Sequence, residues 1–484
     1  MDFVKDIKND VHTRESLIEL KKEVQNGYSI QNDVQLKNKL IELLNHDDAK
    51  IRKNSALLLG YYPDTVDILL KAYELEKTDY VKEAYLKGIA IQDYQPYVQK
   101  LKEIQQQLLQ FDDDTPKHIQ AQLKVLNPLL SKVQVHKKKV IKLKHDPVDV
   151  VLTSLPYYQF VLFEPVLHLR YKPVTQGVLV RTESIYDLMN IRAYKDMLLP
   201  VMGAASLEIN IESIEAGLKR CNIIEILDKL YDDYSVFYYR VVDALRDKNS
   251  QLIKKVSDKI CEIYPTRLLN STENNDIEIV LKEVRKGKVN IYLRLSHYKN
   301  PRFAYRREII PTAIHPYVAA TLMTLAQPYM LPHAKVLDPF VGSGTLLIER
   351  NIALSTAFSM GLDIYGKGIE GAKKNAKLAG FSTIHFVHKD ALRFVNSEMF
   401  DEVFTDMPTL SQVKDENQLH HLYDRFFDRL KRWVRPEGYI FIYTSEIALV
   451  RKNLRLQEGY LNLVEHYEIP RGKNMFYFFI IQMK

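Results

Sequence analysis

The sequence predicts three regions: an all-helical N-terminal segment, a middle α+β domain, and a C-terminal α/β domain with a seven-stranded sheet. Apolar residues recur at helical spacing with no strand pattern up to about residue 130, strands and helices mix from about residue 148, and strands alternate strictly with helices over the last third. The length of 484 residues suits roughly two to four domains. We expect boundaries at 1–145, 146–300 and 301–484.

Composition excludes several classes of protein. Apolar residues make up 46% and charged residues 27% of the chain, which is typical of globular proteins and excludes disordered or fibrous chains. The net charge of +7 permits a polyanionic partner. Cys221 and Cys261 form no CxxC pair, which argues against a disulfide framework or a thiolate zinc site. With no hydrophobic signal core in Met1–Asp10 and no apolar run near about 18 residues, we expect a cytoplasmic protein without a membrane span.

The N-terminal segment carries two loosely similar helical stretches. Residues 48–60 and 79–88 resemble units of a HEAT-type helical repeat. Such a segment could serve as a protein-interaction surface or as an additional RNA-binding surface, and the two loose copies do not decide between them. A basic run without acidic residues then marks a linker or domain edge, and contact with RNA is the less favoured interpretation of it. The run consists of Lys132, Lys137, Lys138, Lys139, Lys142 and Lys144.

The middle region reads as mixed strands and helices. We expect strands at 148–153, 177–180 and 236–242, and helices at 184–194 and 249–264. Alternating apolar residues at 277–281 and 289–295 then flank a turn at 285–288, which predicts a β-hairpin.

The C-terminal region predicts a parallel sheet closed by a hairpin. Strands are expected near residues 335, 359, 385, 402 and 439, and two final strands cover 463–469 and 476–482.

The first of these strands leads into a glycine-rich turn and a helix start, in the segment KVLDPFVGSGTLLIE at 335–349. Small residues there let main-chain amides approach a ligand closely, so we expect a nucleotide-like cofactor. Leu347 replaces the third glycine of a dinucleotide fingerprint, and the Lys-Ser/Thr pair of a P-loop is absent, which disfavours NAD and ATP.

Acidic residues end the following strands of this domain. Asp363 lies 19 residues past Gly344, close to the usual offset for a carboxylate that binds ribose hydroxyls. Asp390 and Asp406 end the next two strands, and ligands of open α/β sheets bind at that edge.

These motifs together resemble the class I S-adenosylmethionine-dependent methyltransferases, specifically the branch fused to THUMP-type RNA-binding domains. The segments that carry the resemblance are DPFVGSGT at 338–345, PTAIHP at 311–316, GLDI at 361–364 and GAKKN at 371–375. Residues 148–295 resemble the ferredoxin-like and THUMP segments of these enzymes more weakly. The expected architecture is therefore a Rossmann-like methyltransferase domain behind a THUMP-like domain and a HEAT-like helical segment.

The resemblance implies a site for S-adenosylmethionine. Its methionine end would lie by the glycine turn, its ribose hydroxyls by Asp363 and its adenine amino group by Asp390. The implied cofactor-binding residues are Asp338, Phe340, Gly342, Gly344, Thr345, Asp363 and Asp390.

The resemblance also implies an acceptor site after the fourth strand. Family members carry Asn or Asp, two prolines and an aromatic residue there, and this chain has Asp406, Met407, Pro408 and Thr409. Asp406 and the Met407 carbonyl would hold an exocyclic amine. Losing the aromatic residue removes a stacking contact of about 1–3 kcal/mol per base. Phe303 or Tyr305 could replace that ring, although packing against the first helix is an equal alternative.

The predicted function is methylation of an exocyclic amine of RNA, most consistent with N2 of guanine in tRNA, with ribosomal RNA as the second choice. Arg285, Lys286 and Lys288 in the hairpin turn are candidate RNA contacts. A catalytically silent RNA-binding protein and a DNA amino-methyltransferase are the alternatives. His315 and His385 lack paired ligand spacing, so no metal site is expected.

Overall fold

The chain forms two compact units in a computed structural model that describes residues 3–110, 116–133, 139–232, 236–296, 298, 300–410, 413 and 415–484. The first unit comprises Met1–Lys142 and Pro200–Tyr298, and the second comprises Leu143–Leu199 and Lys299–Lys484. The middle domain expected at 146–300 is therefore divided near residue 199. Local periodicity in the sequence reports the strands of this region but not the long-range contacts that assign them to one unit or the other.

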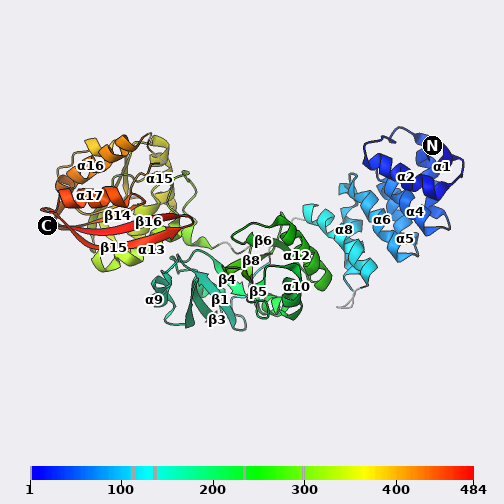
Figure 1. Cartoon of the computed structure of the whole chain (residues 1–484), viewed down its shortest axis with the longest axis horizontal. Coiled ribbons are helices and arrows are strands. Elements are labelled where there is room, and N and C mark those ends of the chain that lie inside the picture. Colours follow the sequence, from blue (N-terminus) through cyan, green and yellow to red (C-terminus); the bar gives the residue numbers. More distant parts are fainter. Residues whose placement is uncertain are drawn as a thin grey trace. The chain divides into compact units, whose positions relative to one another are not determined.

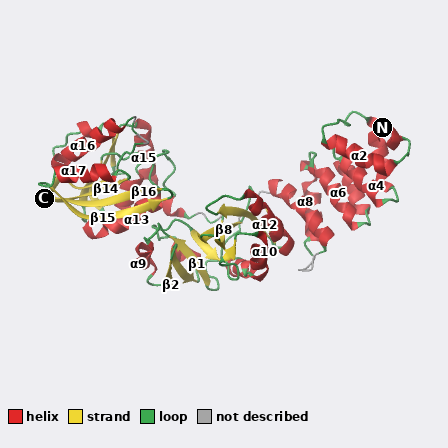
Figure 2. Ribbon diagram, viewed as in Figure 1, coloured by secondary structure: helices red, strands yellow, loops and turns green. Residues whose placement is uncertain are grey.

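The first unit begins with the predicted helices (Figures 1 and 2). Their bounds are α1 Phe3–Lys8, α2 Thr13–Gln25, α3 Val34–Glu42, α4 Ala49–Leu59, α5 Val66–Leu75, α6 Asp79–Ala90, α7 Val98–Leu108 and α8 Lys117–Val133, with short 3₁₀ turns η1 Leu43–Asn45 and η2 Gln95–Tyr97. The Asp48 carboxylate accepts the main-chain N–H of Lys50 at 2.7 Å and so caps α4. The all-helical prediction for this segment is confirmed.

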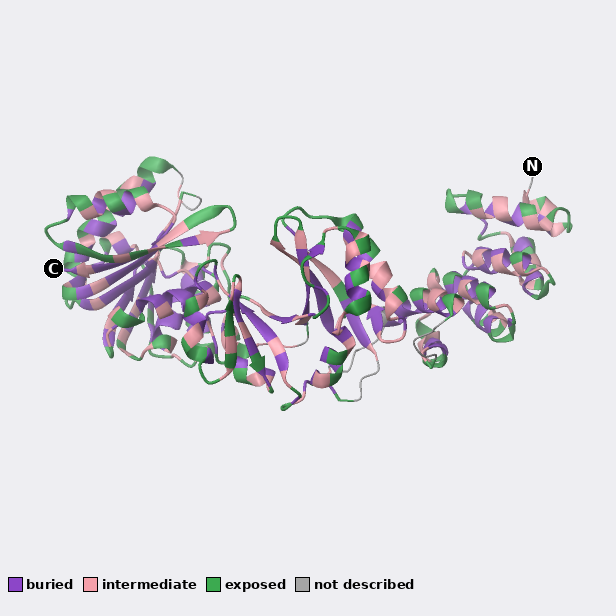
Figure 3. Cartoon of the chain, turned by 60° about the horizontal axis from the view of Figure 1, so that its bottom comes forward, coloured by how far each residue is buried: buried purple, intermediate pink, exposed green. Residues whose placement is uncertain are grey.

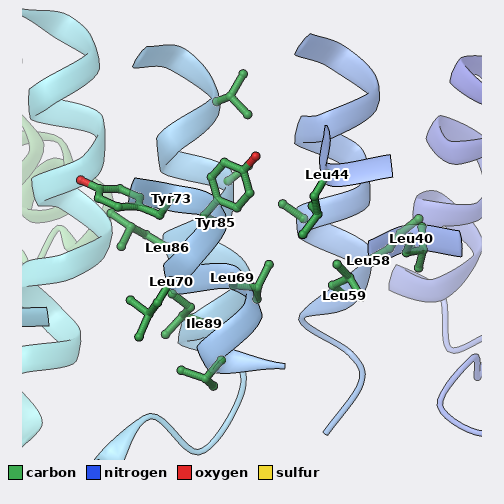
Figure 4. Packing of buried hydrophobic residues seen from close by; sticks show 14 of the residues in the cluster. Leu40, Leu44, Leu58, Leu59, Leu69, Leu70, Tyr73, Tyr85, Leu86 and Ile89 are labelled. Carbon is green, nitrogen blue, oxygen red and sulfur yellow. The ribbon is translucent and has the colours of Figure 1, made fainter. Parts of the chain in front are cut away.

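These helices stack in pairs, and α2, α4, α6 and α8 follow one another in contact. One apolar cluster fills the space between them, with Leu58, Tyr85 and Ile89 among its members (Figure 4). Helices α4 and α6 approach closely: a Cβ atom on Gly88 would lie 2.6 Å from the Ala56 carbonyl oxygen. Glycine at this position therefore allows the two helices to touch.

The remainder of the first unit is an α+β domain. Its elements are β5 Leu207–Glu208, α10 Ile211–Arg220, α11 Ile223–Leu230, β6 Phe237–Ala244, α12 Ser250–Ile263, β7 Leu268–Asn270, β8 Ile277–Arg285 and β9 Lys288–Leu295. Strands β9, β8, β6 and β7 are neighbours in that order, and β5 pairs with β9. Strands β8 and β9 form the predicted antiparallel hairpin.

The second unit starts with a small antiparallel sheet in the order β2-β3-β1-β4. Its elements are β1 Val148–Thr153, η3 Gln159–Leu162, α9 Phe163–Val166, β2 Arg170–Val174, β3 Gly177–Thr182, η4 Ile185–Leu188 and β4 Met197–Pro200. The prediction of a helix at 184–194 is wrong, because only the short η4 forms there. Ile185, Leu188 and Ile191 are nevertheless buried, so the apolar spacing serves an irregular packed loop.

The C-terminal part of this unit is the predicted seven-stranded sheet, in the order β12-β11-β10-β13-β14-β16-β15. All neighbouring strands are parallel except around β16, which pairs antiparallel to both β14 and β15. The elements are η5 Pro301–Phe303, α13 Pro316–Ala326, η6 Gln327–Tyr329, β10 Ala334–Asp338, α14 Thr345–Ala353, β11 Thr356–Asp363, α15 Gly366–Leu378, β12 His385–His388, η7 Ala391–Arg393, β13 Phe400–Asp406, α16 Glu416–Trp433, β14 Val434–Thr444, α17 Ile447–Leu456, β15 Leu461–Arg471 and β16 Asn474–Met483.

Helices flank this sheet on both sides (Figure 2). Helix α16 packs with Val403 and Ile440 of the central strands in one apolar core, and these strands are buried along most of their length (Figure 3). Because the central strands are covered on both faces, their carboxyl ends are the place where a ligand can reach the sheet. Within the described residues no helix is both long and apolar enough to cross a membrane.

Candidate functional site

A cavity of about 590 Å³ lies at the carboxyl ends of β10, β11 and β13. Its walls combine carboxylates with apolar side chains, the usual character of a small-molecule site. The lining residues are Ile310, Pro311, Thr312, Ala313, Ile314, Asp338, Pro339, Phe340, Val341, Gly342, Ser343, Thr345, Leu346, Asp363, Ile364, Tyr365, Asp390, Ala391, Leu392, Asp406, Pro408, Val413 and Leu422.

The glycine turn between β10 and α14 forms the floor of this cavity. Gly342 and Gly344 have φ angles of 52° and 83°, a left-handed conformation that glycine adopts without strain. Between them the Ser343 hydroxyl is buried without a hydrogen-bond partner among the described residues, although it borders the cavity. An unpartnered buried hydroxyl beside a cavity is available to a polar group of a ligand.

Asp363 fixes this turn through its own carboxylate. One oxygen accepts the main-chain N–H of Gly342 at 2.8 Å, and the other accepts that of Tyr365 at 2.8 Å. Each oxygen keeps a second lone pair, so the carboxylate can still accept hydroxyl protons from a ligand. Asp390 caps η7 through the N–H of Leu392 at 2.9 Å and also borders the cavity.

Two carboxyl groups of the cavity favour the neutral form. Burial raises the pKa of Asp338 well above its usual value, and the N–H that Phe340 donates at 3.1 Å opposes this shift. Burial likewise raises the pKa of Asp406 to about 7, while the charge of Arg471 opposes the shift. A carboxyl with a pKa near neutrality at the end of β13 is a candidate for direct contact with a reacting group.

The segment after β13 is held by two tyrosines, Tyr443 on β14 and Tyr423 on α16. The Met407 N–H donates to the Tyr443 carbonyl at 2.9 Å, and the Tyr423 hydroxyl donates to the Pro408 carbonyl at 3.1 Å. The Met407 side chain is 1% exposed and packs in the apolar core. Only the main chain of Met407 can therefore serve the cavity, while Pro408 borders it directly.

The two rings proposed as replacement stacking surfaces do not border the cavity. Tyr305 is 5% exposed, and its hydroxyl donates a hydrogen bond to the Glu349 carboxylate at 2.6 Å. The prediction that Tyr305 stacks on the base is therefore wrong. Phe303 lies under the guanidinium groups of Arg192 and Arg302, at 4.9 and 4.7 Å from its ring centre. Thr409 is likewise outside the lining.

The hairpin cations belong to the first unit. Arg285 donates to the Ser206 hydroxyl at 3.3 Å, Lys288 pairs with Glu208, and Lys286 is exposed. They remain candidate RNA contacts.

In the basic run, Lys137 and Lys138 lie outside the described residues, as does the side chain of Lys132. Lys139 lies 3.7 Å from the centre of the Phe237 ring and 3.6 Å from the Asp276 carboxylate. Because Lys139 is buried, it takes part in packing within the protein and is not a solvated surface residue.

No cluster of three or more metal-binding side chains occurs in the portion of the chain that the structure describes. His315 precedes α13 and lies beside Tyr317, with 5.9 Å between ring centres. His385 is exposed and stacks on Phe358 at 5.0 Å.

The sequence analysis did not single out the apolar walls of the cavity. Ile364 is 72% and Tyr365 is 49% exposed, although both follow the carboxylate that ends β11. Large apolar side chains that stay exposed next to a ligand-binding acid are a signal for a planar ligand. Leu392 and Leu422 add to the same apolar surface.

Comparison with known proteins defines the class of this domain. Residues 304–470 match the family described as "RMKL-like, methyltransferase domain". This part of the chain is therefore similar to methyltransferase domains that use S-adenosylmethionine. The lining would suit that cofactor, because it offers carboxylates for amino and hydroxyl groups, a glycine turn without side chains, and the Ser343 hydroxyl, which has no partner among the described residues.

Two curated relatives are similar to this domain. The chain is 30% identical over 148 residues to a tRNA (guanine(6)-N2)-methyltransferase of Thermus thermophilus, covering 29% of this chain and 42% of the relative. It is 25% identical over 169 residues to a tRNA (guanine(10)-N2)-dimethyltransferase of Methanothermobacter thermautotrophicus, covering 34% of this chain and 49% of the relative. The chain thus spans just under half the length of these relatives.

A solved structure shows the same fold over a longer stretch. The crystal structure of TrmN from Thermus thermophilus matches with a TM-score of 0.52 at 18% identity, covering 70% of this chain and 100% of that one. The fold likeness therefore extends beyond the methyltransferase domain itself.

Proposed function

We propose that this chain is an S-adenosylmethionine-dependent RNA methyltransferase that methylates the N2 amine of a guanine in tRNA, with ribosomal RNA as the alternative acceptor. The observation that carries the proposal is Asp406, a carboxyl with a raised pKa that ends β13 and borders the cofactor cavity. The similarity of residues 304–470 to two tRNA guanine-N2 methyltransferases supports the same acceptor group.

In this proposal, Asp406 accepts one N–H of the acceptor amine and the Met407 carbonyl accepts the other. The two contacts point the nitrogen lone pair at the methyl group and stabilise the positive charge that develops on nitrogen. The bound cofactor supplies a sulfonium methyl group; the N–C bond forms as the S–C bond breaks, and its electron pair stays on sulfur. The amine proton then leaves to solvent. Because the acceptor lies at the floor of a cavity, the base must leave its stack to reach it.

The other regions are assigned supporting roles. Residues 146–300 would be a ferredoxin-like and THUMP-like RNA-binding region that grips the acceptor through its shape and phosphates, with Arg285, Lys286 and Lys288 as contacts. The stacked helices α1–α8 would be a HEAT-like surface for a protein partner or for RNA. Cys221 and Cys261 are both free thiols, which agrees with the proposed cytoplasmic location.

The test combines methyl transfer with an independent measurement of cofactor binding. The purified protein is incubated with methyl-labelled S-adenosylmethionine and total RNA from a strain lacking the gene, and the labelled nucleoside is identified by mass spectrometry. Asp406→Ala should lower the rate on the order of 100-fold while still binding S-adenosylhomocysteine. Glu370→Gln, at an exposed acid of α15, is the matched control and should retain full activity.

The outcomes separate the candidate functions. Label in N2-methylguanosine of tRNA, lost in Asp406→Ala, supports the proposal. Label in DNA would instead favour a DNA amino-methyltransferase. Binding of both RNA and S-adenosylhomocysteine without any label would identify a silent RNA-binding protein, and Met407 and Thr409 would then be the first residues to exchange.

A further inference from the structure

Three cations, Lys195, Arg306 and Arg471, act on a side chain next to the cavity. All three act on one side chain: burial lowers the pKa of His315, and the charges of Arg471, Arg306 and Lys195 lower it further. Arg471 also opposes the raised pKa of Asp406. The three cations therefore lie within electrostatic range of His315, which follows the cavity-lining residue Ile314. We call these three side chains the cationic rim.

Ring stacking and strand register place Arg471 near Asp406. Its guanidinium lies 4.9 Å from the ring centre of Phe476, and Phe476 stacks on Tyr443 at 5.1 Å. Arg471 also donates to the Tyr443 hydroxyl at 3.4 Å. Tyr443 is the register partner of Asp406 between β13 and β14. The end of the β15–β16 hairpin thus presents a positive charge beside the acceptor carboxyl.

Arg306 reaches the same region from the segment before α13. Its Nε donates to the Thr345 hydroxyl at 3.4 Å and its Nη2 to the Ile314 carbonyl at 3.2 Å, and both acceptors belong to residues that border the cavity. Burial lowers the pKa of Arg306 because these neutral acceptors replace water only in part. A half-buried guanidinium held by neutral acceptors alone gains from a nearby anion.

Lys195 completes the rim from the loop before β4. Its side chain is exposed, and its main-chain carbonyl accepts an N–H from Arg302 at 3.4 Å. Arg302 is itself stacked 3.5 Å over the Tyr194 ring, which anchors the loop. These contacts fix the loop before β4, on which Lys195 is exposed.

The rim contrasts with other cations of the second unit. Arg350, Arg435 and Lys452 each pair with a carboxylate. None of the ion pairs found among the described residues involves a rim cation. Asp196 and Asp406 are acids that act on Tyr317 or Tyr443 beside the rim, and with a pKa of about 7 Asp406 is only partly ionised near neutral pH. The rim thus carries excess positive charge at the acceptor side of the cavity.

We propose that Lys195, Arg306 and Arg471 form a clamp for the RNA phosphates that flank the target nucleotide. The inference rests on the proposed function, because it needs an RNA acceptor whose base enters the cavity at Asp406. Once that base leaves its stack, its own phosphates must come to the cavity mouth, where the rim lies. Phosphate contacts position the acceptor without selecting sequence, so the clamp would set orientation and affinity rather than choice of base.

The test measures RNA affinity at several salt concentrations with S-adenosylhomocysteine bound, so that turnover is not needed. The variants are Lys195→Gln, Arg306→Gln and Arg471→Gln, and Arg455→Gln at an exposed site of α17 is the matched control. Each rim variant should weaken RNA binding and lower the slope of log affinity against log salt by about 0.7 to 0.9, as expected for one lost phosphate contact. The control should leave both unchanged, and Arg306→Lys and Arg471→Lys should restore the slope.

Three results would overturn the clamp. The first is that the rim variants bind RNA with the same affinity and the same salt dependence as the wild type. The second is weaker binding of S-adenosylhomocysteine by Arg306→Gln, which would assign this cation to the cofactor carboxylate. The third is a wild-type protein that binds no RNA, which overturns the proposed function as well. RNA binding with a rim-dependent slope but no methyl transfer would support the clamp and overturn only the proposed enzymatic activity.

Discussion

The buried ion pair between Arg350 and Glu402 couples the two elements that carry the site. Arg350 lies on α14, directly after the glycine turn, and Glu402 lies on β13, the strand that ends at Asp406. Both side chains are 0% exposed. Arg350 donates from Nε and Nη2 to the two carboxylate oxygens at 2.7 and 2.9 Å. Its Nη2 also donates to the Leu331 carbonyl, and its Nη1 donates to the Leu354 carbonyl.

Replacing Arg350 by Met should destabilise this domain strongly. The substitution leaves the Glu402 carboxylate buried with the Leu331 N–H as its remaining donor, at 2.6 Å. A buried charge that has lost its partner costs about 3–5 kcal/mol, whereas replacing both partners by apolar residues is often close to neutral. We therefore expect Arg350→Met to lower the free energy of unfolding by about 3–5 kcal/mol, and the double variant Arg350→Met/Glu402→Leu to lower it by less.

The single tryptophan of the chain provides a probe that is specific to this domain. Trp433 ends α16 and is 1% exposed in the core of the seven-stranded sheet. Its fluorescence during urea unfolding reports this domain even if the other regions unfold separately. At a slope of about 1–3 kcal/mol per molar urea, the expected loss moves the midpoint by about 1 M or more.

A change below about 1 kcal/mol for Arg350→Met would refute the reasoning, because water would then have to reach the Glu402 carboxylate. A double variant that is less stable than either single one would refute it as well. The double-mutant cycle, rather than one substitution, isolates the interaction between the two side chains.

The remaining predictions concern two sites, Asp406 and Gly88. Asp406 must be ionised to accept a strong hydrogen bond from the amine, and its pKa is about 7. We therefore expect kcat/KM to rise with pH through about 7, and Arg471→Gln to move the midpoint of this rise upward. A flat pH profile would contradict this. Since the folded pKa exceeds the ordinary value of 3.8, the stability that Asp406 contributes is present below about 3.8 and lost as pH rises through about 7. Asp406→Asn should therefore gain stability relative to wild type between pH 5 and pH 8, measured by Trp433 fluorescence. Gly88→Ala should destabilise the N-terminal helices by about 1–3 kcal/mol, because its methyl group would lie 2.6 Å from the Ala56 carbonyl; unchanged hydrogen exchange in α4 and α6 would contradict this.

Much of the fold and part of the site could be predicted because they depend on local patterns. Apolar periodicity predicted the helices before residue 130 and the seven strands of the last sheet. Four acids at strand ends meet at one edge of a parallel sheet, and Asp338, Asp363, Asp390 and Asp406 all border one cavity. Their individual roles toward cofactor and acceptor stay predictions.

Other features depend on contacts between residues distant in the chain. Tyr305 was a candidate stacking ring, but Glu349, 44 positions away, accepts its hydroxyl in the core. The apolar spacing at 184–194 suggested a helix, yet η4 is all that forms there. The division of the middle region near residue 199 and the pKa of Asp406 likewise depend on packing.

The amino-acid sequence by itself determined the order of helices and strands, the glycine turn and the acids at the strand ends, because periodicity and turn chemistry act over a few residues. Only the tertiary structure decided which side chains are desolvated and which charges lack a counter-charge. Burial and charge pairing are set by neighbours that the fold brings together from distant segments, as Lys195, Arg306 and Arg471 are brought together around His315.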